Sequence, residues 1–258
     1  MDFTKKVQQT TVPEGKIAVF WLGQAGFLIK TAADKLIAID PYFSDCVERL
    51  IPEEGYGFKR IMPALCDADA LIFDTLIISH EHYDHFDVDA IEDMMKNRRT
   101  EVYTNSPAAA QMRDMELEIS RIHVMEKNSR IDLGDFTLLP VDCDHGELAP
   151  QAMGVILEFP SVKLYYAGDT ALSPERLQQA ISERPDVAIL PINGAFGNLN
   201  SEQAAKYADM LGASVCIPCH FWTFPLHMGD PMSLIRLMPE LAPNCELKLL
   251  HQGECVFF

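Results

Sequence analysis

The sequence predicts an α/β protein built as a four-layer αβ/βα sandwich, with two β-sheets packed face to face and helices outside. Two observations carry this prediction. The chain passes twice through the same order of elements, first short strands separated by tight turns and then strands alternating with helices. The stretches 35–40 and 163–169 also resemble each other, since both begin with Lys-Leu and end an apolar strand on an aspartate. We therefore expect two similar halves within a single domain covering residues 1–258.

The first half begins with short strands that Gly23, Gly26 and the pair Ala33-Asp34 separate. Its last helix is opened by Ser106 as the N-cap and by Pro107 at the first helical position. We expect strands at 17–22, 27–30 and 35–40, a Pro- and Gly-containing loop at 41–63, a strand at 75–79, a helix at 88–97, a strand at 101–104 and a helix at 107–115.

The second half repeats the pattern from Ser129 onward. Apolar runs of strand length come first, and apolar residues at helical spacing then alternate with further strands. We expect strands at 136–141, 154–159 and 162–167, a helix at 174–183, a strand at 187–190, a helix at 201–211, a strand at 214–219 and a helix at 231–238.

The charge balance limits the class of partner. With 21 basic and 38 acidic side chains, the net charge is −17. A polyanion such as RNA is repelled at long range by such a chain, so we expect no nucleic-acid partner. A small-molecule substrate is the expected partner, and the sequence leaves a homo-oligomer open.

Segments that would direct the chain to a membrane or out of the cell are not evident. No stretch approaches the roughly 18 apolar residues of a membrane span, and the N-terminal lysines precede no apolar run. Seven cysteines without a secretory signal indicate a reducing cytoplasm and free thiols. The pair Cys216 and Cys219 lies in an apolar strand without a second pair, which favours buried thiols over a redox or zinc motif.

The segment His80–His85 reads His-x-His-x-Asp-His and directly follows an apolar strand. Residues i and i+2 of an extended chain project to one side, so His80 and His82 can hold one ion. As the chain turns, Asp84 and His85 can reach a second ion. Imidazole nitrogen and carboxylate oxygen suit zinc, manganese or iron. Because the chain has only eight histidines, three within six positions predict a metal site.

Three further residues follow strands of the second half and are candidate ligands. They are His145, Asp169 and His220. A strand-end carboxylate such as Asp169 can bridge two cations, because its charge offsets their mutual repulsion. Two ions about 3.5–4 Å apart are typical of hydrolytic two-metal sites.

Together these residues resemble the metallo-β-lactamase superfamily. Stretches around Trp21–Ile29, Tyr165–Thr170 and Leu190–Gly194 resemble more narrowly its ascorbate-phosphate lactonase branch. The resemblance implies that His80, His82 and His145 bind one ion and Asp84, His85 and His220 the other, with Asp169 and a water or hydroxide bridging them. It also implies that Asp40 supports the motif by hydrogen bonding. Gln24 departs from the pattern, because many relatives carry histidine there.

The implied activity is a metal-dependent hydrolase of a small, anionic ester such as a phosphorylated sugar lactone. Its cofactors are two divalent transition-metal ions, manganese or zinc first and iron or nickel next, and Asp84, His82 and Asp169 are the candidate catalytic residues. The alternatives are a phosphodiesterase or nuclease of the same fold and, in another class, a non-catalytic metal-binding protein. Candidate substrate contacts are His227, Trp222, Phe196 and Asn198.

Overall fold

The computed structural model describes residues 2–258, which fall into two compact units. The first unit comprises the chain up to residue 125 together with residues 251–258, and the second comprises residues 126–250. Each unit contains one seven-stranded mixed sheet. The two halves anticipated from the order of elements therefore correspond to two sheets, and the single-domain boundary stays a prediction.

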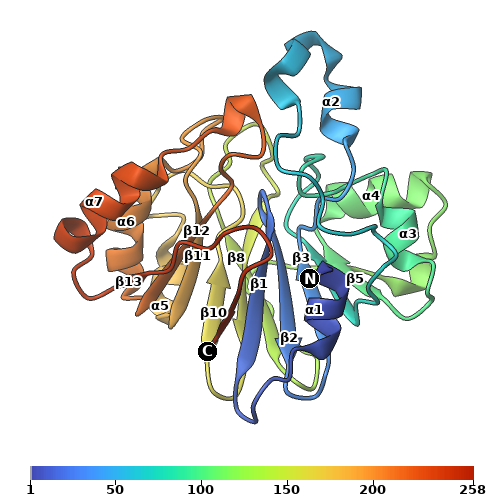
Figure 1. The fold of residues 1–258 in the computed structure, drawn as a ribbon, viewed down its shortest axis with the longest axis horizontal. Helices are drawn as coiled ribbons and strands as arrows, with labels where there is room; N and C mark the ends of the chain where they lie inside the picture. The colour runs from blue at the N-terminus through green and yellow to red at the C-terminus, as the bar shows by residue number, and fades with distance from the viewer. Residues whose placement is uncertain (1) are drawn as a thin grey trace. The chain divides into compact units, whose positions relative to one another are not determined.

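The sheet of the first unit includes the last strand of the chain, which lies beside the first (Figure 1). In sheet order its strands are β14 (Cys255–Phe257), β1 (Ile17–Gly23), β2 (Gly26–Thr31), β3 (Leu36–Ile39), β4 (Thr75–Ile78), β5 (Glu101–Thr104) and β6 (Ile122–Val124). Strands β3 to β6 are parallel, and β2 is antiparallel to both β1 and β3. Strands β1, β3, β4 and β5 consequently end at one edge of the sheet.

The first unit also contains six helical segments within the described residues. They are α1 (Phe3–Gln9), α2 (Cys46–Leu50), η1 (Pro52–Phe58), α3 (Ile91–Met95), α4 (Ser106–Asp114) and η2 (Ile119–Arg121). Phe20, Leu28 and Leu76 of the sheet form one buried cluster with Ile91 of α3 and Met112 of α4. Burying a side chain of this size contributes about 1.5–3 kcal/mol to the free energy of unfolding. The cluster therefore holds β4 in place against the helices.

The sheet of the second unit has the same arrangement of antiparallel and parallel strands. In sheet order its strands are β13 (Glu246–Leu247), β12 (Val215–Cys219), β11 (Val187–Pro191), β10 (Lys163–Tyr166), β9 (Met153–Glu158), β8 (Thr137–Asp142) and β7 (Ile131–Asp132). Strands β10 to β13 are parallel, and β9 is antiparallel to both β8 and β10. Strands β8, β10, β11 and β12 therefore end at one edge, which gathers the loops that follow them.

The helical segments of the second unit are α5 (Gln178–Glu183), α6 (Ser201–Leu211), η3 (Pro225–His227) and α7 (Pro231–Leu241). Helix α6 begins with a capping box, in which the side chain of Asn200 accepts from the backbone of Gln203 and the Gln203 side chain accepts from the backbone of Asn200. It ends at Gly212, which takes the left-handed conformation (φ +65°). Both ends of α6 are thus fixed by local sequence.

Several elements differ from the sequence prediction. The helix expected at 88–97 is limited to Ile91–Met95, because residues before it form a turn around Asp87, whose carboxylate accepts from the backbone of Asp89. The helix expected at 174–183 begins only at Gln178, after a turn. The expected loop at 41–63 contains α2 and η1, and α1 was not anticipated. No helix in residues 2–258 combines the length and apolar character required to cross a membrane.

Candidate metal centre

In the first unit, the His-x-His-x-Asp-His segment is anchored by the buried carboxylate of Asp40, which follows β3. Asp40 Oδ1 accepts from the Ser79 backbone at 2.7 Å, and Oδ2 accepts from Ser79 Oγ at 2.5 Å. The ring nitrogen Nδ1 of His85 lies 2.6 Å from the same Oδ2. Asp40 therefore ties the end of β3 to both ends of the predicted metal-binding loop.

This network also fixes where two histidines carry their protons. A carboxylate only accepts, so His85 Nδ1 must donate to Asp40. The Ser79 hydroxyl donates its proton to Asp40. His80 Nδ1, which lies 3.0 Å from Ser79 Oγ, must therefore donate to Ser79 Oγ. In the neutral form of each ring the proton is then on Nδ1, and Nε2 carries the lone pair that a metal-ligating histidine requires.

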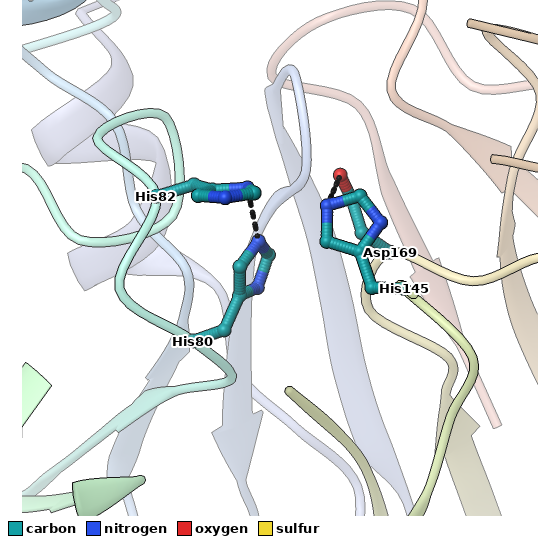
Figure 2. A group of neighbouring side chains, drawn as sticks. All are labelled: His80, His82, His145 and Asp169. Carbon is teal, nitrogen blue, oxygen red and sulfur yellow. Dashed lines mark hydrogen bonds and ion pairs between the residues drawn. The ribbon is translucent and has the colours of Figure 1, made fainter. Parts of the chain in front are cut away.

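The donor atoms of the loop form two pairs within the first unit. His80 Nε2 and His82 Nδ1 lie 3.0 Å apart, the dashed contact between the two rings in Figure 2. His85 Nε2 and Asp84 Oδ2 lie 3.8 Å apart. Two nitrogens on one tetrahedral zinc are about 3.3 Å apart for bonds of 2.0–2.1 Å, so both spacings suit a shared cation.

Gln24, which follows β1, holds the Asp84 carboxylate. Its side-chain nitrogen Nε2 donates to Asp84 Oδ2 at 2.9 Å, and both side chains are buried. The Gln24 backbone takes a left-handed conformation (φ +49°), and its carbonyl accepts from Trp21 Nε1 at 3.0 Å. The residue that departs from the family pattern thus orients a predicted ligand.

In the second unit, the Asp169 carboxylate lies between two histidines. Its Oδ2 is 3.6 Å from His145 Nε2, the contact drawn for this pair in Figure 2, and its Oδ1 is 3.2 Å from His220 Nε2. Each oxygen therefore faces a different imidazole.

The loop that carries His145 is held by polar contacts that sequence analysis missed. Thr170 Oγ1 accepts from the backbone of Asp144 at 2.9 Å, which joins this loop to the Asp169 segment. Arg176 binds Asp144 and, together with Lys127, Asp142. Burial alone would raise the pKa of Asp142, but the hydrogen bonds from Arg176 and Lys127 outweigh it and lower that pKa. The sequence signalled only Asp142 among these residues, because it follows the predicted strand 136–141 directly.

The predicted substrate contacts lie in loops after β11 and β12. The ring of His227 lies on that of His220, with centroids 4.7 Å apart, and Phe196 contacts His227 edge-on at 5.2 Å. Phe196 and Trp222 are each 46% exposed. Phe196, Trp222 and His220 all have positive φ values, between +52° and +61°. Non-glycine residues in this strained region cluster at functional sites. Asn198 is buried in the same loop.

The cysteines take no part in this chemistry. All seven are free thiols. Cys216 and Cys219 are buried in β12, and burial raises the pKa of Cys216. Burial also raises the pKa of Cys143, beside the His145 loop, to about 12. The Cys143 and Cys216 thiols therefore stay protonated at neutral pH and do not offer the thiolate that a metal or redox site needs.

The donor sets in both units fit a transition-metal ion. They consist of imidazole nitrogens and carboxylate oxygens, the ligands of zinc, manganese and iron sites. Asp40, His80 and His85 form one group whose donor atoms lie within 4.8 Å of one another. Asp40 is nevertheless a support rather than a ligand, because both its oxygens are engaged by Ser79 and His85.

Comparison with known proteins identifies the family. The model of the beta-lactamase superfamily domain matches residues 37–221, so the chain belongs to this family. Its two mixed sheets with helices are the metallo-β-lactamase fold, which confirms the fold class predicted from the sequence.

Relatives of similar length carry related descriptions. A UPF0173 metal-dependent hydrolase of Hyperthermus butylicus is 28% identical over 245 residues, covering 93% of this chain and 99% of its own length. One from Methanobrevibacter smithii is 29% identical over 254 residues, covering 91% and 94%. Among solved structures, the isothiocyanate hydrolase of Delia radicum gut bacteria has a TM-score of 0.73 at 19% identity and covers 93% and 98%. Igni18, a metallo hydrolase of Ignicoccus hospitalis, has 0.71 at 22%, covering 94% and 98%.

Proposed function

We propose that this protein is a cytoplasmic metal-dependent hydrolase of a small, anionic ester, such as a phosphorylated sugar lactone. Two divalent ions, manganese or zinc first, would be its cofactors. As the family resemblance implies, His80, His82 and His145 would bind one ion and Asp84, His85 and His220 the other, and Asp169 would be shared. The metal-dependent hydrolases among the relatives support this reading.

The observation that carries the proposal is the position of Asp169. Its two carboxylate oxygens face the Nε2 atoms of two different histidines at 3.6 and 3.2 Å. A single structural ion does not require a carboxylate whose two oxygens face different histidines. A site for two ions does, because a shared anion reduces the repulsion between two cations.

Residues of the chain itself would transfer protons and orient the metal ligands. Divalent ions bound here would lower the pKa of water toward neutrality and would polarise the oxygen of the bond to be cleaved. Asp84, held by the amide of Gln24 at 2.9 Å, is placed to accept and return a proton while keeping its orientation. The Asp40 network favours the tautomer in which neutral His80 and His85 carry their protons on Nδ1, which leaves Nε2 for coordination.

The substrate class follows from charge and from the family resemblance. The chain has a net charge of −17, so clustered basic contacts to a polynucleotide backbone are not favoured. A small anion instead responds chiefly to the local field of the two cations. The stretches that resemble the ascorbate-phosphate lactonase branch favour a lactone within this class.

The test is a substrate screen on protein stripped with a chelator and reloaded with manganese or zinc. Sugar-acid lactones with and without phosphate are compared with bis(p-nitrophenyl) phosphate. We expect lactone hydrolysis that depends on the metal and is lost in Asp169→Asn but not in Asp135→Ala, an exposed aspartate of the same unit. Phosphodiester cleavage without lactone turnover would favour the phosphodiesterase alternative. Metal uptake with no turnover of either class would favour a metal-binding protein.

A further inference from the structure

Two asparagine side chains in the second unit are buried without hydrogen-bond partners. Asn193 is 9% exposed and Asn198 is 6% exposed. Neither the nitrogen nor the oxygen of either carboxamide has a partner within residues 2–258. Most buried polar atoms in proteins are paired, because an unpaired one has lost water without replacing it. Four unpaired atoms in one short loop therefore call for a reason.

The loop connects β11 to α6 and is tied to the segments that carry two predicted ligands. Ile192, next to Asn193, donates its backbone N–H to Cys219, the neighbour of His220, at 3.0 Å. Leu199, next to Asn198, donates to Thr170, the neighbour of Asp169, at 2.9 Å. Asn193 and Asn198 are thus each adjacent to a residue whose backbone N–H binds a segment that carries a predicted metal ligand.

The loop between the two asparagines has an unusual backbone conformation. The carboxamide atoms are enclosed, so a ligand reaches them only if the loop opens. Gly194 and Gly197 have φ values of +63° and +84°, and Phe196 has the same sign at +52° without being a glycine. Phe196 is also 46% exposed and touches His227. A strained, partly exposed tip on a buried polar base is poised to exchange its present packing for contacts with a ligand.

We infer that Asn193 and Asn198 are substrate-binding residues that recognise hydroxyl groups, an inference that rests on the proposed function. A carboxamide offers both a donor and an acceptor and carries no charge. A hydroxyl group also donates and accepts, so it satisfies either end of the amide. Carboxylate or phosphate groups only accept and are better matched by cations. The substrate is therefore a polyhydroxylated ester whose uncharged part enters this loop.

The test compares Asn193→Leu and Asn198→Leu with Asn200→Leu. All three changes replace a carboxamide by an apolar group of similar size, but the Asn200 side chain is paired in the capping box. We expect Asn200→Leu to lower the melting temperature. The other two variants keep or raise it, because no hydrogen bond is lost. In manganese-loaded protein, the ratio of kcat/KM for glucono-δ-lactone over δ-valerolactone falls roughly tenfold in these two variants and stays at the wild-type value in Asn200→Leu.

A binding measurement separates this inference from the proposed function. Gluconate should raise the melting temperature of wild-type protein and of Asn200→Leu, but not of Asn193→Leu or Asn198→Leu. If the wild type hydrolyses no lactone, the proposed function fails and the gluconate shift still decides the inference. Melting temperatures lowered as in Asn200→Leu with an unchanged lactone ratio would overturn it. An absent gluconate shift in the wild type, or equal shifts in all proteins, would also overturn it.

Discussion

The change Asp40→Asn tests how the histidine protons are set. Asp40 accepts three hydrogen bonds, two from Ser79 and one from His85, at 2.5–2.7 Å. An asparagine keeps one oxygen for the Ser79 backbone and turns an NH₂ group toward His85 Nδ1. That nitrogen must then accept, so its proton moves to Nε2, where it blocks coordination.

The expected size of the effect follows from losing this support. Removing a partner that orients a ligating histidine typically lowers metal affinity 10–100-fold. At about 1.4 kcal/mol per tenfold, this corresponds to about 1.4–2.8 kcal/mol of binding free energy. The lost charge-assisted hydrogen bonds also lower the free energy of unfolding, by about 2–4 kcal/mol.

The assay is competition for zinc or manganese with a chelator of known affinity, together with ¹⁵N NMR of the imidazoles. The matched control is Asp87→Asn. Asp87 is equally buried, but its carboxylate accepts from Phe43, Ser44 and Asp89 rather than from a histidine. We expect both variants to lose stability and only Asp40→Asn to lose affinity and shift its proton to Nε2. Wild-type affinity in folded Asp40→Asn would refute the reasoning.

Three further predictions concern the bridge, pH and the thiols. Asp169→Ala should lose metal and activity together, whereas His145→Ala should retain at least one ion by elemental analysis; equal metal in Asp169→Ala and wild type would contradict the bridging role. The pKa of Asp142 is lowered in the fold, so its ionised form stabilises the protein above the unfolded-chain pKa of about 3.9, and this contribution is lost as pH falls through the lowered value. Asp142→Asn should therefore be destabilised at pH 7 and approach wild type at pH 3 in denaturant unfolding. Cys143, whose pKa is about 12, should resist iodoacetamide at pH 8 until the protein is unfolded, and labelling of the native protein at Cys143 would show that its burial is incomplete.

The fold could be predicted, and the metal ligands proposed, because both rest on local patterns. Apolar runs of strand length and helical periodicity are read directly from sequence, and the His-x-His-x-Asp-His segment concentrates donors within six residues. The positions of His145, Asp169 and His220 after strands sufficed to propose them as ligands. Strand ends of one direction meet at one sheet edge, so position along the chain carried spatial information.

The features that could not be predicted depend on partners distant in the chain. The start of α3 at Ile91 depends on Asp87, which holds the backbone of Phe43 and Ser44 as well as its own turn. The role of Gln24 depends on Asp84, which is sixty residues away. The unpaired carboxamide of Asn193 follows from what the fold leaves around it. No periodicity or spacing encodes contacts of this kind.

The central proposal is that two metal ions share the carboxylate of Asp169. The most direct measurement is anomalous X-ray diffraction from crystals of the manganese- or zinc-loaded protein. We expect two peaks about 3.5–4 Å apart, each about 2.0–2.2 Å from a different oxygen of Asp169, with His145 beside one and His220 beside the other. A single peak that does not touch Asp169, or metal bound only elsewhere on the protein, would contradict the account.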